Sequence, residues 1–234
     1  MAVTDRAARK RAPRGRTSLT QAQRAPAERR ARPILRKLAA AYPDWGPTLE
    51  FRTPLDLLVA TILAAQARDE RINEVTRSLF KRYRTARAYA RAPQATLESE
   101  VRATGFYRQK AKTVRAMAAD LLERFDGEVP KDMDGLTSLH GVGRKTASIV
   151  LGAAFRVPAV AVDRHVARVA TRLALSKAKD PEGIEEDLRR LYGRRDWIKV
   201  TWTFVFHGRR TCTPTPACSR CPVRDLCPYP KKTI

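Results

Sequence analysis

The spacing of the apolar residues most restricts what this 234-residue chain can fold into. From Pro33 onward these residues recur at steps of three and four, as on one face of an α-helix. The segment with Ile72, Val75, Leu79 and Tyr83 is an example of such a face. No stretch alternates apolar and polar residues as a half-buried strand requires. The sequence therefore predicts an all-α protein.

Capping residues predict where several of these helices begin. Thr53-Pro54 and Asp180-Pro181 each place a hydrogen-bonding side chain before a proline in the first helical turn. Asp163 stands where a further helix is expected to start. These signals divide the chain into a series of short helices rather than a few long ones.

The charge is strongly positive, with 47 Lys and Arg against 24 Asp and Glu, which gives a net charge of +23. Such a surface favours a polyanionic partner. Residues 1–32 hold ten of the basic residues and two acidic ones, and they predict a disordered basic tail. A solvated arm, a nonspecific nucleic-acid tether and an organelle transit peptide are all compatible with this composition. The longest apolar stretch, residues 149–155, is too short to cross a membrane.

One segment combines two glycines with the start of an apolar helix. It reads Leu139-His140-Gly141-Val142-Gly143-Arg144-Lys145. Glycine permits positive φ and leaves no Cβ between the backbone amides and a ligand, and the helix start favours an anion. No strand precedes the segment, which disfavours a dinucleotide-binding loop and a P-loop. We predict a phosphate-binding hairpin between two helices, with a plain tight turn as the alternative.

Two motifs carry a family resemblance. Leu-x-Gly-Val-Gly-Arg-Lys-Thr-Ala, followed by Val-Asp-x-His-Val, resembles the helix-hairpin-helix DNA glycosylases and specifically the endonuclease III family. The resemblance covers residues 33–230. It implies that the hairpin, His140 to Arg144, binds a DNA phosphate through its amides, often with a monovalent cation. It also implies that Lys145 is the nucleophile and Asp163 its catalytic partner.

The chemistry of these two residue types agrees with those roles. A lysine amine that attacks C1′ of a damaged nucleotide displaces the base and forms a Schiff base. Elimination of the 3′ phosphate can follow and cut the strand. Asp163 could stabilise the cationic sugar and help to move protons. The alternatives are a surface phosphate contact for Lys145 and a simple helix cap for Asp163.

The resemblance also supplies two residues that would enter the DNA. An enzyme that acts on a stacked base must extrude the nucleotide and fill the gap. The segment Leu63–Asp69 is similar to the family's Ser-Ala-Gln-x-x-Asp stretch, which gives Gln66 this role. Gly105-Phe106-Tyr107 aligns with a loop whose usual wedge is leucine, so Phe106 would be a broader wedge. The alternative for Phe106 is an ordinary core position.

Four cysteines, Cys212, Cys218, Cys221 and Cys227, lie close together near the C-terminal end. Their gaps of five, two and five residues, with prolines between them, predict a loop wrapped around a metal group. Structural zinc usually uses two close pairs, and only one is present, so a 4Fe–4S cluster fits better. The resemblance points to the same cluster, although the family's first gap is typically six residues. Zinc and unmetallated thiols remain alternatives.

Together these features predict two helical domains with the active site in the cleft between them. A helical barrel with the hairpin would span 53–159, and 33–52 with 160–234 would form a discontinuous domain that holds the cluster. We expect a monomeric, bifunctional DNA glycosylase and abasic-site lyase that removes oxidised pyrimidines from duplex DNA containing damaged bases or abasic sites. A bacterial protein of this kind would be cytoplasmic. A non-catalytic helix-hairpin-helix DNA-binding module and a glycosylase without lyase activity are the alternatives.

Overall fold

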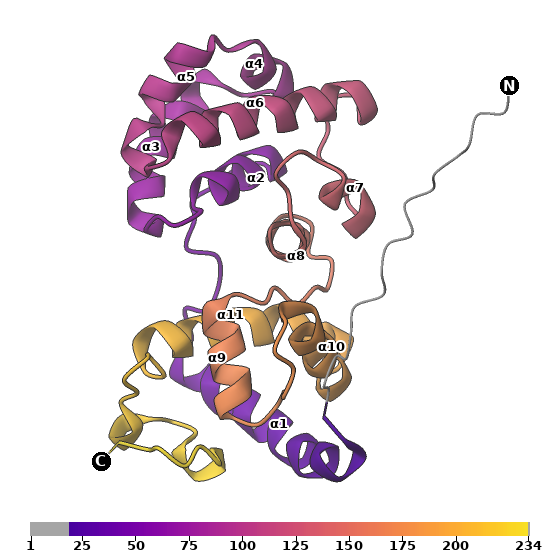
Figure 1. Ribbon diagram of the computed structural model, residues 1–234, viewed down its shortest axis with the longest axis vertical. Coiled ribbons are helices and arrows are strands. Elements are labelled where there is room, and N and C mark those ends of the chain that lie inside the picture. The colour runs from indigo at the N-terminus through magenta and orange to yellow at the C-terminus, as the bar shows by residue number, and fades with distance from the viewer. Residues whose placement is uncertain (1–18, 234) are drawn as a thin grey trace, which may run out of the picture.

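The computed structural model describes residues 19–233, and every regular element in that range is helical (Figure 1). The prediction of an all-α fold is confirmed. The α-helices are α1 (Gln21–Ala41), α2 (Pro54–Leu63), α3 (Asp69–Arg82), α4 (Ala86–Arg91), α5 (Gln94–Glu100), α6 (Tyr107–Arg124), α7 (Met133–Thr137), α8 (Arg144–Ala154), α9 (Arg164–Arg172), α10 (Pro181–Leu191) and α11 (Trp197–Arg210). Short 3-10 turns lie at Arg102–Thr104, Arg194–Asp196, Cys218–Arg220 and Arg224–Leu226.

The capping signals mark the helix starts as predicted. The Thr53 hydroxyl accepts the backbone N–H of Asp56 at 3.1 Å before α2. The Asp180 carboxylate accepts the backbone N–H of Gly183 at 2.8 Å before α10. Each cap satisfies a donor that the first turn of a helix leaves without a partner. The helix boundaries here follow from local chemistry.

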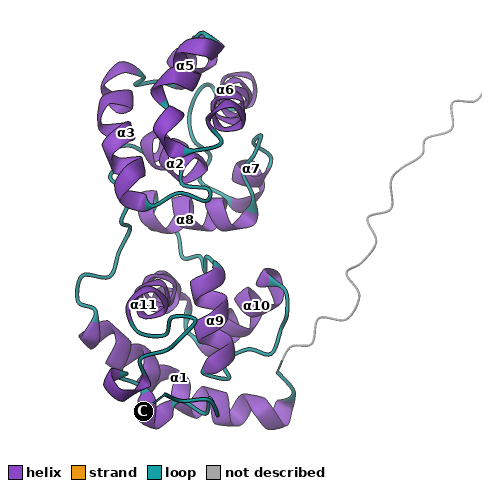
Figure 2. Ribbon diagram, turned by 60° about the vertical axis from the view of Figure 1, so that its left-hand side comes forward, coloured by secondary structure: helices purple, strands orange, loops and turns teal. Residues whose placement is uncertain are grey.

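The buried apolar side chains form two separate cores. The helices that carry them lie in two groups (Figure 2). The first core lies within residues 55–159 and is built by α2 to α8. The second core unites residues 19–42 with 160–223, so α1 packs with α9, α10 and α11. Two connections join the helix groups, one after α1 and one after α8 (Figure 1). We propose that the two cores are two domains. Leu49 and Phe51 pack against the first core, so the first division lies before residue 49 and not at 53, and the second lies near residue 160.

The extent of the predicted basic tail needs correction. Residues 1–18 lie outside the described residues, but residues 21–32, also expected in the tail, belong to α1. Ala27 and Ala31 are fully buried in the second core, and the Arg30 guanidinium donates to the carbonyls of Leu173 at 2.7 Å and Leu226 at 3.0 Å. The expectation of disorder rested on the scarcity of large apolar residues in this segment. Its small alanine side chains instead allow close helix packing. Tertiary contacts thus order a segment whose composition suggested disorder.

The position of the first turn of α9 is set by a close approach to α11. A Cβ on Gly208 would lie 2.8 Å from the His165 Cβ and 3.2 Å from its Cα. Only a glycine in α11 therefore permits this contact. Because His165 lies in the first turn of α9, the packing fixes the position of Asp163 just before it. None of the helices between residues 19 and 233 is long and apolar enough to span a membrane.

Candidate active site and cysteine loop

A cavity of about 1070 Å³ contains three of the residues singled out from the sequence. Gln66 lines it from the loop between α2 and α3, Lys145 from the first turn of α8, and Asp163 from the residue before α9. The lining combines residues of the first core with residues that precede and follow α9. The fold thus brings together side chains that lie almost 100 residues apart in the sequence.

Asp163 is a helix cap and also faces the cavity. Its Oδ1 accepts the backbone N–H groups of His165 and Val166, both at 2.8 Å. Its Oδ2 has no hydrogen-bond partner among the described residues. The two bonds fix the orientation of the carboxylate and engage only one of its oxygens, in a residue that lines the cavity. Capping and catalysis, posed as alternatives from the sequence, are therefore compatible at this residue.

Lys145, the expected nucleophile, lies in the first turn of α8. It is exposed and lines the same cavity as Asp163. Its ammonium group makes no hydrogen bond or ion pair within residues 19–233. The side chain is therefore available to a ligand that enters the cavity.

The two positions of the hairpin glycines require glycine for different structural reasons. Gly141 has φ +72°, and a Cβ there would lie 2.3 Å from the Thr113 Cγ2 on α6. Gly143 has φ −90° with open space around it, so positive φ explains only Gly141. At Gly143 the missing side chain instead leaves the neighbouring amides accessible. The expectation of positive φ for the pair is corrected at this residue.

The hairpin and the first turn of α8 present a set of free backbone donors. The His140 N–H donates to the Asp120 Oδ2 at 2.6 Å, and the Val142 N–H donates to the Leu139 carbonyl at 3.1 Å. Five backbone amides, one before Val142 and four in succession after it, have no acceptor in the described part of the chain. They belong to Gly141, Gly143, Arg144, Lys145 and Thr146. Such a group of N–H donors at a helix start suits an anion such as phosphate.

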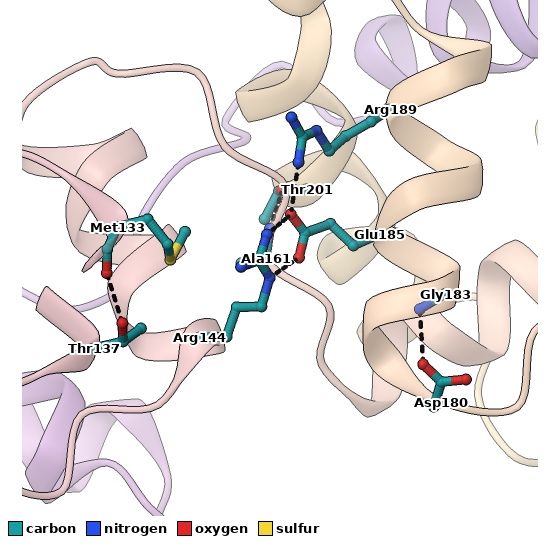
Figure 3. Close-up of polar contacts among 9 residues, drawn as sticks. All are labelled: Met133, Thr137, Arg144, Ala161, Asp180, Gly183, Glu185, Arg189 and Thr201. Carbon is teal, nitrogen blue, oxygen red and sulfur yellow. Dashed lines mark hydrogen bonds and ion pairs between the residues drawn. The ribbon is translucent and has the colours of Figure 1, made fainter. Parts of the chain in front are cut away.

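The Arg144 side chain is already engaged. Its Nε and Nη2 donate to the two carboxylate oxygens of Glu185 on α10, at 2.6 and 2.8 Å (Figure 3). The Glu185 carboxylate raises the pKa of Arg144. The sequence suggested Arg144 as a DNA contact and gave no signal for Glu185, which lies 41 residues away among other charged residues.

The two residues expected to enter DNA lie in strained backbone. Gln66 has φ +58° and is exposed at the cavity. Phe106 has φ +48° and its side chain is 69% exposed, so the core alternative is wrong. The buried Lys110 ammonium donates to the Thr104 carbonyl at 2.7 Å and so braces the loop that leads to Phe106. Burial lowers the pKa of Lys110.

Other cavity contacts were not predicted from the sequence. The Arg209 guanidinium on α11 donates to the Asp69 carboxylate at 2.8 Å, and both residues line the cavity. The Thr201 hydroxyl accepts the Ala161 N–H at 3.0 Å, which holds the segment just before Asp163 (Figure 3). No local pattern marks these pairs, because each joins segments at least 40 residues apart.

The four cysteines form no disulfide bond with one another, and their loop packs against the second core. Cys218 is buried and the other three are half-buried. Arg172 donates to the Cys212 Sγ at 3.4 Å, and the Arg168 guanidinium to the Cys212 carbonyl at 2.8 Å. Burial raises the pKa of the Cys221 and Cys227 thiols. Arginines of α9 therefore hold the loop in place.

Comparison with known proteins agrees with this arrangement. The family model of HhH-GPD superfamily base excision DNA repair proteins matches residues 59–194. Endonuclease III of Synechocystis sp. is 45% identical over 203 residues, which cover 86% of this chain and 93% of that protein. Endonuclease III of Bacillus subtilis is 38% identical over 195 residues, covering 82% and 89%.

Solved structures show the same similarity. A trapped endonuclease III–DNA covalent intermediate superposes with a TM-score of 0.82 at 39% identity, covering 86% of this chain and 96% of that one. A thermostable thymine-DNA glycosylase, at 21% identity and a TM-score of 0.79, shares the fold. The chain belongs to the HhH-GPD superfamily of base excision DNA repair proteins and, within it, to the endonuclease III family.

Proposed function

We propose that this protein is a bifunctional DNA glycosylase and abasic-site lyase that removes oxidised pyrimidines from duplex DNA. The observation that carries the proposal is the shared cavity: Lys145 and Asp163 line it together, from two different cores. A non-catalytic DNA-binding module would leave this pairing without a purpose. The substrate class comes from the resemblance to the endonuclease III family.

Lys145 would act as the nucleophile. Its Nζ forms a bond to C1′ while the glycosidic bond breaks, and the base leaves with the bonding electrons and gains a proton. Opening of the sugar ring gives a Schiff base, which makes the C2′ proton acidic. Loss of that proton breaks the C3′–O bond and releases the 3′ phosphate. Hydrolysis of the imine then returns the free lysine.

Asp163 would stabilise the positive charge that develops on the sugar and assist the proton transfers. Its free Oδ2 is the atom suited to this role, because Oδ1 is held by two backbone donors. A carboxylate whose orientation is fixed in advance needs little rearrangement during the reaction. The cap thereby contributes to the chemistry as well as to α9.

The remaining site residues would hold and distort the DNA. The free amides around Gly141 and Gly143 would bind a phosphate, and hairpin carbonyls could bind a monovalent cation beside it. Gln66 and Phe106 would fill the space that the extruded nucleotide leaves. The exposure of Phe106 supports this role, since an apolar ring in water gains free energy when it stacks on bases.

We further propose that the four cysteines hold a 4Fe–4S cluster. A single zinc ion requires four sulfurs at about 2.3 Å from one point. Within the described residues, no three Cys, His, Asp or Glu side chains converge closely enough to hold one ion. A cluster takes one thiolate at each of its irons, so its ligands stand farther apart. About four irons per chain with matching sulfide would support the cluster, and zinc without iron would refute it.

Borohydride trapping with a duplex containing thymine glycol tests the enzymatic proposal. We expect a covalent protein–DNA complex that Lys145→Ala abolishes. Lys81→Ala, which removes an exposed lysine at the far end of α3, should trap like the unmodified protein. Strand cleavage without any trapped species would overturn the lysine mechanism. Binding without base release would favour the non-catalytic module.

A further inference from the structure

Arg144 on α8 and Glu185 on α10 form a charged pair in which the carboxylate is buried. The two side chains share two hydrogen bonds, and Glu185 is only 6% exposed. Arg189 adds a third, longer contact to the same carboxylate at 3.5 Å. The Arg189 guanidinium in turn lies 4.5 Å from the centre of the Trp197 ring. A planar guanidinium paired in this way fixes orientation as well as distance.

This pair joins the two cores beside the nucleophile. Arg144 is the first residue of α8, directly before Lys145, and α8 belongs to the first core. Glu185 lies on α10, which packs against α9, and α9 begins directly after Asp163. The Arg144–Glu185 pair (Figure 3) therefore connects the helix that carries Lys145 to the helices next to Asp163.

Few other contacts bridge the two cores. The described helices that pack most extensively on each other all belong to the same core. Across the boundary, Arg209 pairs with Asp69 at the cavity, and Gly152 of α8 faces Ile198 of α11. With few contacts across the boundary, the relative position of the cores depends on individual pairs of residues, of which Arg144 with Glu185 is one.

We propose that Glu185 is a positioning residue: by holding Arg144, it sets the reach of Lys145 toward the sugar that Asp163 stabilises. The inference rests on the function proposed above and adds a residue to it. A misplacement of about 1 Å in a reacting group can slow a reaction about 100-fold. Loss of the pair should consequently slow chemistry much more than it weakens DNA binding.

The test compares Glu185→Gln with Glu186→Gln, its neighbour, whose side chain is 43% exposed and pairs with Arg190. Single-turnover trapping on an abasic-site duplex, with enzyme in saturating excess, measures the chemistry. Affinity for a duplex with an unreactive tetrahydrofuran site measures binding. We expect Glu185→Gln to slow trapping about 10- to 100-fold while its affinity stays within about threefold. Glu186→Gln should match the unmodified protein in both measurements.

Arg144→Lys provides a second variant, because it alters a more exposed side chain and keeps the charge while removing the planar fork. It should slow trapping to a similar degree. The double variant should be no slower than the worse single one, since the two residues act as a unit. Thermal unfolding of each variant identifies any that fail to fold, in which case Arg144→Lys decides the outcome.

Two results would overturn the inference. One is trapping at the unmodified rate in both Glu185→Gln and Arg144→Lys. The other is a loss confined to affinity, which would make Arg144 a phosphate contact instead. If the unmodified protein itself forms no trapped complex, the proposed function fails, and the role of Glu185 is not the cause.

Discussion

At the scale of single residues, the structure shows how one side chain can serve two purposes without conflict. Asp163 uses Oδ1 to cap the start of α9, and the residue also lines the cavity. Gly141 likewise combines positive φ with a close approach to Thr113. At each position one residue therefore meets two separate requirements. Substitutions can separate the two purposes.

Asp163→Asn and Asp163→Ala provide such a separation. Asparagine caps helices about as well as aspartate, so Asp163→Asn should be clearly more stable than Asp163→Ala, which should cost about 1–2 kcal/mol. Both should slow single-turnover base release at least about 100-fold, because neither supplies a carboxylate. Thermal unfolding and burst-phase kinetics check the two effects. Full activity in Asp163→Asn would show that the residue is a cap only.

At the scale of elements, the site depends on how α9 meets α11. Gly208 permits the contact, and the Thr201 hydroxyl ties the segment before α9 to the same helix. The first turn of α9 is thus held from α11 at two places. Its position is set by packing as much as by its own cap.

Gly208→Ala should show this dependence. The new Cβ would meet the backbone of His165, including the carbonyl oxygen at 3.3 Å, and backbone cannot yield as a flexible side chain does. We expect a loss of about 1–3 kcal/mol in the free energy of unfolding. Base release should also slow, because Asp163 would shift with α9. Denaturant unfolding measures the first effect and single-turnover kinetics the second.

Gly193→Ala is the matched control, since a Cβ there meets nothing within 4 Å and φ is −62°. Its stability should stay within about 0.5 kcal/mol of the unmodified protein. Equal losses in the two variants would contradict the assignment of the effect to helix packing.

At the scale of the whole molecule, the net charge of +23 is divided between two parts. Residues 1–18 carry six basic residues and one acidic one. The described part carries the remaining excess, including the arginines around the hairpin and the cysteine loop. A charged segment that touches only phosphates contributes to affinity in proportion to the counterions it releases.

Removal of residues 1–18 should weaken binding to undamaged duplex at low salt. If all six basic residues contact phosphates, the slope of log affinity against log salt should become shallower by up to about 5. Single-turnover chemistry should be retained, because Lys145 and Asp163 lie in the described cores. A salt titration and trapping kinetics measure these outcomes. Collapse of the chemistry would place the removed segment in the site.

Removal of residues 1–32 should behave differently. It would cut into α1 and delete Ala27, Arg30 and Ala31 from the second core. We expect a lower unfolding temperature for this shorter protein. The contrast between the two truncations checks where the ordered protein begins.

The sequence by itself determined the helical class, several helix starts and the residue types expected to carry the chemistry. Those properties are local: the three-to-four spacing, a Thr53 or Asp180 cap and the hairpin glycines act over one or two turns of chain. The roles expected of Lys145, Asp163, Gln66 and Phe106 came from motifs that are also short. The exposure of Phe106 and the cavity around the other three then placed these residues in space.

Only the tertiary structure decided which distant groups meet. It made residues 21–32 part of a core, paired Arg144 with Glu185, and joined Asp69 to Arg209. Each contact joins residues that are tens or hundreds of positions apart and depends on how the helices pack. The spacing of side chains along the chain does not predict which of these residues meet. Burial of a charged group becomes favourable only when its partner is already in place. Short sequence motifs therefore predict which residues carry the chemistry, whereas the packing of the helices decides how these residues are arranged.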